Sequence, residues 1–566
     1  MFLLPYPKKI NFTEGFLKSK VLKINNICSD ERIEKALRFF KTGNDDVVLT
    51  VETKNGEGEG YSLSISEDRI HIEGNSAGGV FYAIQTLRQI FESEQVRCLE
   101  IEDEPDMNTR GFYHDVTRGK IPTVERLKKL IDTMAYYKMN SLQLYVEHVF
   151  PFKELGDLVH KTSHLTPDEI KELDDYCYEN FIEFVPSIAT FGHLYELLQT
   201  ESYKHLRCLE EFNVERIFWA ERMDHHTIDP SKKESFQVIC SLIDQYLPLF
   251  RTNKFNICCD ETYDLKKENK SDEEIGKLYV DFVKKIISHL ESRGKTVMMW
   301  GDIVLKHPEI IEQLKDRVTF LNWWYSAEPI EENVKVFSEL NCKQIVCPGT
   351  NSWSRLVENV NVADKNIEKL LDYGHKYNAL GMLNTNWGDH GNPCSLEMSV
   401  HGLVLGAAKS WNILTAPDKK FKDSLNNLEY RNEKAVKYLT MLDDAHKKII
   451  WNNLTFLYSN LIYDKKFEFE YPSMDDIEYS VSVAQSVVKE LSGQIWEREE
   501  YRSEMLIAAE GITVMAELFG KFAQYRIERV SDTKEWLKKY RESWVKYNKE
   551  SELCEIEKMF VFLENA

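Results

Sequence analysis

The chain has 566 residues, of which 43% are hydrophobic and 29% are charged, a composition ordinary for a globular protein and long enough for two or three domains. Its formal net charge of −21 argues against binding to nucleic acid or to an anionic membrane surface, because both would repel it. The sequence contains no stretch of about twenty apolar residues, so we expect no membrane insertion.

The cysteines and the N-terminus bear on the compartment. The 11 cysteines are odd in number and show no Cys-x-x-Cys spacing, which predicts reduced thiols rather than a disulfide framework. The first residues turn polar at Lys8 and lack the long apolar stretch of a secretory signal. Together these features predict a cytoplasmic protein.

The first part of the chain predicts a small α/β domain, which we place at residues 1–105. Residues 47–51 are apolar like a buried strand, and residues 61–65 alternate between apolar and polar side chains. A helix is expected after the potential N-cap Ser76, because the following apolar residues Ala83, Leu87 and Ile90 fall on one helical face.

From residue 106 to residue 412 the pattern changes to strands that alternate with helices. The apolar segments that predict the strands are eight in number: 111–116, 142–146, 182–187, 255–259, 296–300, 318–323, 344–347 and 381–384. Eight strand–helix units predict a (β/α)8 barrel, known as a TIM barrel. Residues 413–566 have helical periodicity and predict a helical C-terminal domain, which is also a candidate surface for a homodimer.

Polar and aromatic residues follow the predicted barrel strands. The carboxyl ends of the strands in such a barrel meet at one face, where active sites lie. We therefore expect these side chains to converge: Asp115, Glu147, His148, His193, Asp260, Glu261, Trp300, Asp302, Trp324, Tyr325, Trp353, Trp387 and Asp389.

Asp260 and Glu261 are the central candidates, because two carboxylates at the end of a buried strand are costly to place without a purpose. Adjacent side chains on an extended chain point to opposite sides, so the two cannot be equivalent groups around one bond. We expect one to protonate a leaving oxygen while the other orients or stabilises a neighbouring group.

The tryptophans indicate what the site binds. Sugars present flat C–H faces that pack on aromatic rings. One tryptophan alone is more often part of a core. Four at the ends of predicted strands favour a carbohydrate pocket: Trp300, Trp324, Trp353 and Trp387.

Two segments carry a specific resemblance. Residues 110–118 (RGFYHDVTR) and 137–144 (YKMNSLQL), with the Asp260-Glu261 pair, resemble the β-N-acetylhexosaminidases of glycoside hydrolase family 20 over about residues 40–410. The resemblance implies a retaining exo-enzyme that removes terminal β-linked N-acetylhexosamine by substrate-assisted catalysis. The acetamido oxygen of the substrate would form an oxazolinium ion, with Glu261 as acid and base and Asp260 holding the acetamido N–H.

Other residues carry over from the family one at a time. Arg110 matches the arginine that binds ring hydroxyls, and His193 matches a histidine that supports the acid. Asp389 stands where the family has a glutamate that reaches the outer hydroxyls. The tryptophans that match the acetamido pocket and platform are Trp300, Trp324 and Trp387. The resemblance implies neither a cofactor nor a metal, and its substrates would be glycans or glycoconjugates ending in N-acetylglucosamine or N-acetylgalactosamine.

Three departures from the family pattern stand out. The family's His-x-Gly-Gly-Asp-Glu reads Asn-Ile-Cys-Cys-Asp-Glu at residues 256–261. The second strand ends in Glu147-His148, where many members have two aspartates. No tyrosine follows the seventh strand, so Tyr325 after the sixth is the candidate for holding the acetamido oxygen.

Rival interpretations remain open at this point. A barrel glycosidase with its own nucleophile would need a second acid about 5 Å from Glu261, for which Glu147 and Asp302 are candidates. A sugar-binding protein without catalysis is a second rival. A metal hydrolase is a third, because of the cluster Asp224, His225, His226 and Asp229, but adjacent histidines cannot readily reach one metal ion.

Overall fold

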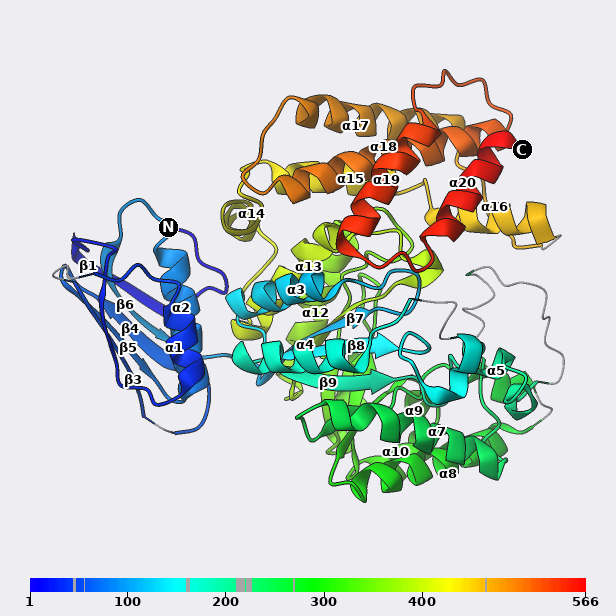
Figure 1. The fold of residues 1–566 in the computed structure, drawn as a ribbon, viewed down its shortest axis with the longest axis horizontal. Coiled ribbons are helices and arrows are strands. Elements are labelled where there is room, and N and C mark those ends of the chain that lie inside the picture. The colour runs from blue at the N-terminus through cyan, green and yellow to red at the C-terminus, as the bar shows by residue number, and fades with distance from the viewer. Residues whose placement is uncertain are drawn as a thin grey trace.

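The computed structural model describes residues 1–43, 47–54, 56–158, 163–209, 219, 226–267, 270–463 and 466–566. Asp224 and His225, named above as candidate metal ligands, lie outside these residues. The described chain forms an N-terminal α/β domain, a barrel and a C-terminal helical region, which confirms the predicted architecture (Figure 1). The residue boundaries that we set between the three domains stay predictions.

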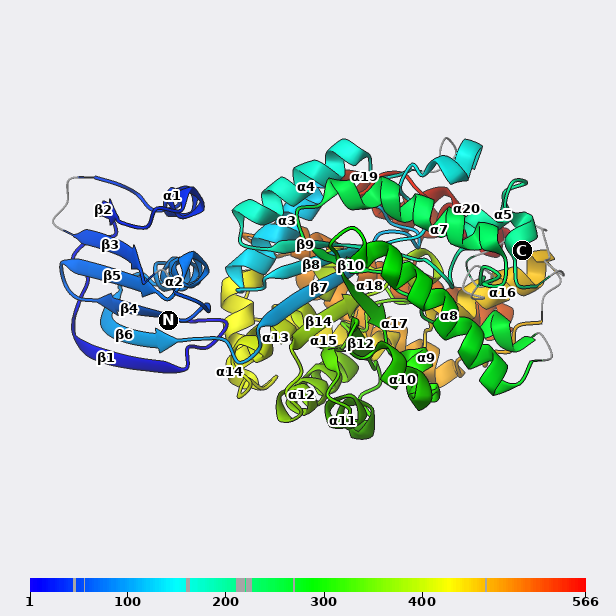
Figure 2. The same cartoon turned by 90° about the horizontal axis from the view of Figure 1, so that it is seen from below.

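The N-terminal domain is one mixed sheet covered by two helices. Within the described residues its strand order is β1-β6-β4-β5-β3-β2. The strands are β1 Lys9–Phe16, β2 Lys23–Asn26, β3 Val48–Thr53, β4 Tyr61–Ile65, β5 Arg69–Gly74 and β6 Arg97–Asp103. Helices α1 (Glu31–Leu37) and α2 (Ala77–Ile90) lie on the side of the sheet that faces the barrel (Figure 2). The predicted cap is present, because the Ser76 side chain accepts a hydrogen bond from the Gly79 N–H.

The barrel closes in the order β10-β11-β12-β13-β14-β7-β8-β9, counted over the described residues, and its strands are parallel. The strands are β7 Thr109–Asp115, β8 Ser141–Val146, β9 Glu183–Ile188, β10 Lys254–Asn256, β11 Thr296–Trp300, β12 Val318–Trp323, β13 Lys343–Cys347 and β14 Gly381–Asn386. Each corresponds to a predicted strand. β10 is shorter than predicted because Cys258 and Cys259 have φ values of 57° and 62°, which an extended strand cannot accommodate.

Helices wrap the outside of the barrel and bury one apolar face against it. α3 shows the pattern: Thr123 caps its N-terminus, and Leu127, Leu130, Ile131 and Met134 are buried. The helices in this part are α3 Val124–Tyr136, α4 Pro167–Glu179, α5 Tyr195–Gln199, α7 Lys233–Tyr246, α8 Asp272–Glu291, α9 Asp302–Lys306, α10 Pro308–Leu314, α11 Glu331–Glu339, α12 Val360–Lys376 and α13 Val400–Trp411.

The helical region packs along the barrel (Figure 1). Its helices are α14 Lys419–Leu425, α15 Ala435–His446, α16 Trp451–Tyr463, α17 Met474–Ser492, α18 Glu499–Phe522, α19 Thr533–Tyr547 and α20 Leu553–Asn565. Several of its contacts reach loops that follow barrel strands. The Lys549 ammonium donates to the His164 carbonyl at 2.7 Å, and the Tyr540 hydroxyl donates to the Pro393 carbonyl at 3.0 Å.

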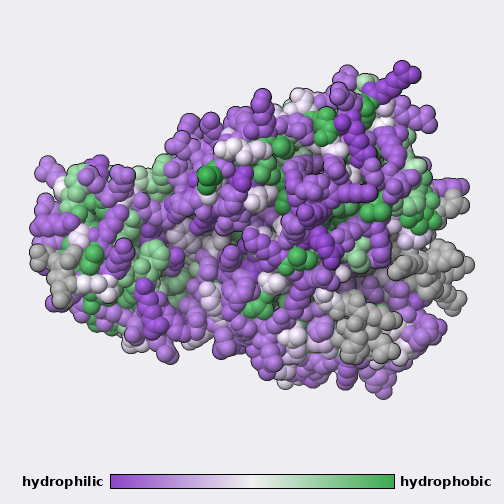
Figure 3. All heavy atoms as spheres, turned by 45° about the horizontal axis from the view of Figure 1, so that its top comes forward, coloured by the Kyte–Doolittle hydropathy of each residue, from purple (hydrophilic) through white to green (hydrophobic). Residues whose placement is uncertain are grey.

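The surface is mostly hydrophilic on the face shown in Figure 3, with hydrophobic residues scattered among charged ones. This agrees with the high content of charged residues. Among the described residues, none of the helices combines the length and the apolar character needed to cross a bilayer.

Candidate active site

The catalytic candidates meet at the carboxyl ends of the barrel strands. Asp260 and Glu261 follow β10, and His193 follows β9. The two loops approach closely because residue 192 is glycine: a β-carbon there would lie 2.6 Å from the Asp260 carbonyl oxygen. The sequence thus places a small residue where the backbone carrying His193 has to reach the acid pair.

The backbone before the acid pair is left-handed, although this chain has two cysteines there in place of glycines. Cys258 and Cys259 occupy the region of φ that favours glycine, and Glu261 has a φ of 47°. The two cysteines therefore keep the conformation expected of the family's two glycines. The surroundings hold them there: the Cys258 N–H donates to Asn256 Oδ1 at 2.9 Å, and the Tyr279 hydroxyl donates to the Cys259 carbonyl at 2.8 Å.

His193 faces both carboxylates. Its Nε2 lies 3.3 Å from Asp260 Oδ2 and 3.5 Å from Glu261 Oε2. Burial opposes the charged imidazolium, but the two acids raise the pKa of His193 to about 10. Glu261 is the most exposed of the three, with 25% of its side chain accessible against 11% for Asp260 and 3% for His193. Glu261 is therefore the group best placed to meet a bound substrate.

A third acid, Asp302, lies behind this pair. Its Oδ2 accepts a hydrogen bond from the Glu261 N–H at 3.2 Å, and its Oδ1 is buried without a hydrogen-bond partner among the described residues. Burial and the charges of Asp260 and Glu261 raise the pKa of Asp302 to about 7. Asp302 therefore fixes the backbone of Glu261 and keeps its own proton over much of the acidic range.

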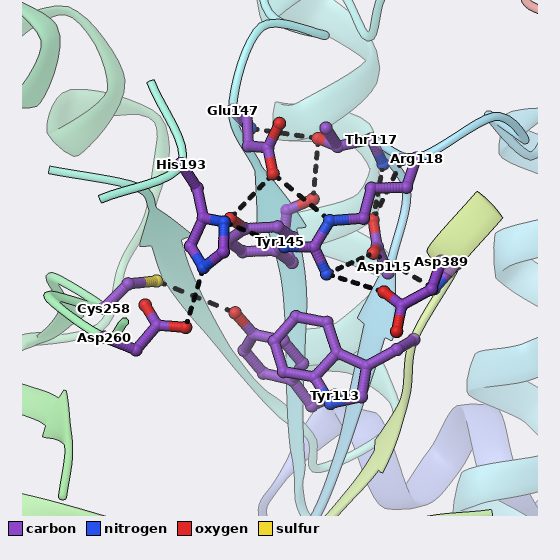
Figure 4. A network of polar contacts seen from close by, with 12 residues as sticks. Tyr113, Asp115, Thr117, Arg118, Tyr145, Glu147, His193, Cys258, Asp260 and Asp389 are labelled. Atoms are coloured by element: carbon purple, nitrogen blue, oxygen red, sulfur yellow. Dashed lines mark hydrogen bonds and ion pairs between the residues drawn. The ribbon is translucent and has the colours of Figure 1, made fainter. Parts of the chain in front are cut away.

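Arg118 organises the other side of the site (Figure 4). Its guanidinium lies 3.0 Å from Asp389 Oδ1, 3.4 Å from Glu147 Oε1 and 3.5 Å from Asp115 Oδ2. It also lies 3.4 Å from His193 Nδ1, and the Glu147 carboxylate interacts with both of these cations. One cation thus holds three carboxylates that come from three different strand ends.

Glu147 is an ionised, shielded member of this network. It receives a hydrogen bond from the Tyr145 hydroxyl at 2.9 Å, and it faces His193 in Figure 4. Burial would raise the pKa of Glu147, but hydrogen bonding to His148 and the charges of Arg118 and His193 lower it to about 2. Glu147 therefore stays charged at any working pH and stabilises the two cations.

The loops after β7 and β14 are joined directly. The Gly388 N–H donates to Asp115 Oδ2 at 3.1 Å. Farther along, a β-carbon at Gly119 would overlap the carbonyl of Gly391, and both glycines have positive φ. This close approach brings Arg118 within reach of Asp389.

Aromatic rings form the floor of the site, between the acids around His193 and the carboxylates around Arg118. Trp300 and Trp387 lie with their centroids 5.7 Å apart, and each ring is 5.1 Å from that of Tyr113. The Arg118 guanidinium lies over Trp387 at 5.2 Å. Trp300 is fully buried and Trp387 is 8% exposed, so the floor is rigid and apolar.

Tyr325 and Trp353 extend this floor, whereas Trp324 turns elsewhere. The Trp387 Nε1–H donates to the Tyr325 hydroxyl at 2.8 Å, and the ring of Trp353 meets that of Tyr325 edge-on at 5.0 Å. The Trp324 Nε1–H instead donates to Ser326 Oγ at 2.6 Å within its own loop. A role for Trp324 in binding stays a prediction.

The prediction for Arg110 is wrong. Arg110 is the second residue of β7, at the amino end of the barrel, and it is fully buried. Its guanidinium pairs with Glu59 of the N-terminal domain at 2.7 Å and donates to the carbonyls of Lys138 and Met107 at 2.8 and 3.0 Å. The barrel's whole height separates it from residues that follow the strands, so it cannot contact a sugar bound there.

Sequence reasoning missed Arg118 as a site residue, although the segment that carries the resemblance contains it. The signal was available: Arg118 follows the end of its strand, whereas Arg110 is the second residue of that strand. Tyr113 and Tyr145, which support Trp387 and Glu147, were missed as well. They lie inside predicted strands, where a tyrosine is indistinguishable from an ordinary core residue.

One group in the described residues has the spacing of a metal site. Ligand atoms of His193, Asp260 and Glu261 all lie within 4.8 Å of one another. A divalent cation bound there would compete with the protons on which acid–base chemistry depends. The expectation of a metal-free, cofactor-free enzyme stays a prediction.

Comparisons with known proteins agree with this geometry. Residues 108–412, more than half of the chain, match the family model "Glycosyl hydrolase family 20, catalytic domain", and residues 2–104 match "Glycosyl hydrolase family 20, domain 2". A β-hexosaminidase of Porphyromonas gingivalis is 27% identical over 286 residues, which is 44% of this chain and 36% of that protein. Hexosaminidase D of Bos taurus is 27% identical over 208 residues, which is 35% of this chain and 57% of that protein.

Solved structures share the fold. The chitobiase of Flavobacterium johnsoniae superposes with a TM-score of 0.61 at 18% identity and covers 99% of both chains. A β-N-acetylhexosaminidase of Bacteroides fragilis gives a TM-score of 0.59 at 19% identity and covers 75% of this chain and 94% of its own. Because the two family models match the N-terminal domain and the barrel, the chain belongs to glycoside hydrolase family 20.

Proposed function

We propose that this protein is a retaining exo-β-N-acetylhexosaminidase that removes terminal β-linked N-acetylglucosamine, N-acetylgalactosamine or both. The observation that carries the proposal is the pairing of His193 with Asp260 and Glu261 at 3.3 and 3.5 Å, beside a floor of tryptophans. An acid, an orienting carboxylate and a sugar platform are the groups that this reaction needs.

In this mechanism Glu261 protonates the glycosidic oxygen as the bond to the leaving group breaks. The acetamido oxygen of the substrate attacks the anomeric carbon, so that an oxazolinium ion forms. Asp260 accepts a hydrogen bond from the acetamido N–H and stabilises the positive charge. Glu261 then takes a proton from the water that attacks the anomeric carbon and opens the oxazolinium ring. The two displacements together retain the anomeric configuration.

The surroundings of the two rival acids support substrate assistance over an enzyme nucleophile. Asp302 is bonded to the backbone of Glu261, and its raised pKa of about 7 leaves it largely protonated below neutral pH, which makes it a poor nucleophile. Glu147 is occupied by Arg118 and by the Tyr145 hydroxyl. Neither is free to approach an anomeric carbon opposite Glu261.

Arg118 and Asp389 are the proposed ligands of the sugar hydroxyls. A guanidinium donates hydrogen bonds and a carboxylate accepts them, so the pair can bind a hydroxyl group both as an acceptor and as a donor. Asp389 is 21% exposed and Arg118 is 8% exposed, so the carboxylate faces outward and the cation backs it. Such a pair reaches an equatorial or an axial hydroxyl at C4, which leaves the choice between the two epimers open.

A three-substrate comparison tests the proposal. The p-nitrophenyl β-glycosides of N-acetylglucosamine, N-acetylgalactosamine and glucose are assayed side by side with the purified protein. Cleavage of the acetamido sugars alone is expected, and the ratio of their rates gives the preference at C4. Equal cleavage of the glucoside would instead show an enzyme nucleophile, and no cleavage of any of the three would favour a sugar-binding protein.

A further inference from the structure

The loop after β14 carries Asp389 in a backbone that needs outside support. His390, Gly391 and Asn392 have φ values of 56°, 87° and 49°, all in the left-handed region. Glycine adopts this conformation readily and asparagine tolerates it, so His390 is the residue of the three whose backbone most needs support. The contacts that hold them also fix the neighbouring Asp389.

Helix α16 of the helical region supplies three of these contacts, all to His390. The Trp451 Nε1–H donates to the His390 carbonyl at 2.8 Å. Thr455 Oγ1 lies 3.5 Å from His390 Nδ1, and the Phe456 ring meets the imidazole edge-on at 5.7 Å. Trp451 and Thr455 are fully buried, so the contacts are shielded from water and from thermal rearrangement.

The next residue of the loop, Gly391, is held by a contact outside α16. Gly391 packs against the ring of Trp219, where a β-carbon would lie 2.6 Å from the indole. The Trp219 Nε1–H in turn donates to Glu552 Oε2 at 2.6 Å, just before α20. Two separate parts of the helical region therefore fix residues 390–391, one directly and one through Trp219.

We propose that the helical region positions Asp389 for sugar binding, and that Trp451 is the positioning residue through which it acts. The inference rests on the proposed function, in which Asp389 and Arg118 bind the sugar hydroxyls. Because His390 follows Asp389 directly in the chain, a shift of the His390 main chain, whose carbonyl Trp451 holds, moves the Asp389 carboxylate relative to Arg118. The helical region is then part of the binding machinery and not only a packing partner of the barrel.

The test compares two tryptophan variants with matched chemistry. Trp451→Phe removes an indole donor from a backbone carbonyl and keeps an aromatic ring. Trp536→Phe does the same inside the helical region, where Trp536 Nε1–H donates to the Ile507 carbonyl at 3.0 Å. We expect Trp451→Phe to raise KM about five-fold, the loss typical of one hydrogen bond, with a smaller change in kcat. Trp536→Phe should leave KM unchanged.

A double-mutant cycle separates positioning from general loosening. In an Asp389→Ala background the side chain that Trp451 positions is already gone, so adding Trp451→Phe should have no further effect on KM. An undiminished five-fold effect in that background would overturn the inference, as would equal KM values for the two tryptophan variants. The melting temperature of each variant shows whether it is folded. If Trp451→Phe melts well below the wild type, Thr455→Val is used in its place.

Binding of N-acetylglucosamine by calorimetry gives a second readout. Weaker binding by Trp451→Phe than by Trp536→Phe is the expected result. If the wild-type protein neither cleaves the acetamido glycosides nor binds the sugar, the proposed function itself fails and the inference falls with it. If the wild type does both while Trp451→Phe matches it, only the inference fails.

Discussion

Two arginines lie at opposite ends of the same barrel strand. Arg110 is the second residue of β7, and Arg118 follows the carboxyl end of this strand. Both are buried, and both lie over aromatic rings, at 5.0 Å from Trp411 for Arg110 and at 5.2 Å from Trp387 for Arg118. Burial, charge and aromatic contact are therefore the same at the two ends.

The partners of the two arginines differ. Arg110 is bound by main-chain carbonyls and by one carboxylate, Glu59 of the N-terminal domain, which is 26% exposed. Arg118 is bound by side-chain carboxylates, of which Asp389 is 21% exposed and able to bind something else as well. Exposure of the partner does not separate the two arginines, because Glu59 is 26% exposed. The comparison teaches that a buried cation marks a candidate site when several carboxylates from different strand ends meet it at the catalytic face.

The largest effect is expected at the catalytic face. Glu261→Gln removes the proton donor and keeps the shape, so kcat for an aryl N-acetylglucosaminide should fall about 10²- to 10⁴-fold. Steady-state kinetics measure the loss, and an unchanged melting temperature shows that the fold is intact. A variant with wild-type kcat would remove Glu261 from the mechanism.

At the amino end of the barrel the expected effect is on stability. Arg110→Met keeps most of the volume but leaves Glu59 and several carbonyls without their donor, which should cost about 3 kcal/mol. Urea denaturation measures the loss. The kcat/KM of the protein that remains folded should match the wild type; a specific loss of kcat/KM would show that the two ends are coupled.

Arg118→Met makes the matching change at the catalytic face. It removes charge-assisted hydrogen bonds to the side chains that form the proposed sugar site, so kcat/KM should fall on the order of 10²-fold, mainly through KM. The same kinetic assay measures it. If Arg118→Met lowered only stability and Arg110→Met only activity, the assignment of the two ends would be reversed.

A further effect is expected on how stability depends on pH. The pKa of His193 is about 10 in the folded protein against about 6.5 for a free imidazole, so the stabilisation is complete below pH 6.5 and disappears as the pH rises through 10. His193→Gln should therefore flatten the fall of the melting temperature over that window. An unaltered slope would mean that another group causes it.

Asp302 also makes stability fall as the pH rises, but in a lower window. Its pKa is raised to about 7 from an ordinary value near 3.9, so stability is lost as the pH rises from about 4 to 7. Asp302→Asn should remove that loss. Because the two windows hardly overlap, melting curves of the two variants separate the contributions of the histidine and the buried acid.

Much of the fold could be predicted from periodicity alone. The strand predicted at residues 296–300 coincides with β11, and that at 318–323 coincides with β12, because a buried parallel strand leaves a short apolar run between helices. The strand at 255–259 could not be placed as well. Cys258 and Cys259 fit the apolar pattern of a strand. The neighbouring sequence does not indicate that packing holds their backbone at positive φ.

The candidate site divides in the same way. The sequence by itself determined the acid pair, because Asp260 and Glu261 follow an apolar strand, where two ionised carboxylates are costly to place. It also determined which residues follow the strands, among them His193 and Asp389. These are facts about chain order, and chain order fixes which end of a strand a residue occupies.

Only the tertiary structure decided which arginine serves the site and what holds Asp389. Arg118 meets Asp389 because Gly119 and Gly391 let two loops far apart in the sequence touch. His390 keeps its left-handed backbone because Trp451 reaches it from a separate helical region. The physical reason is that both depend on contacts between distant segments, whose energies come from packing that no local pattern of residues encodes.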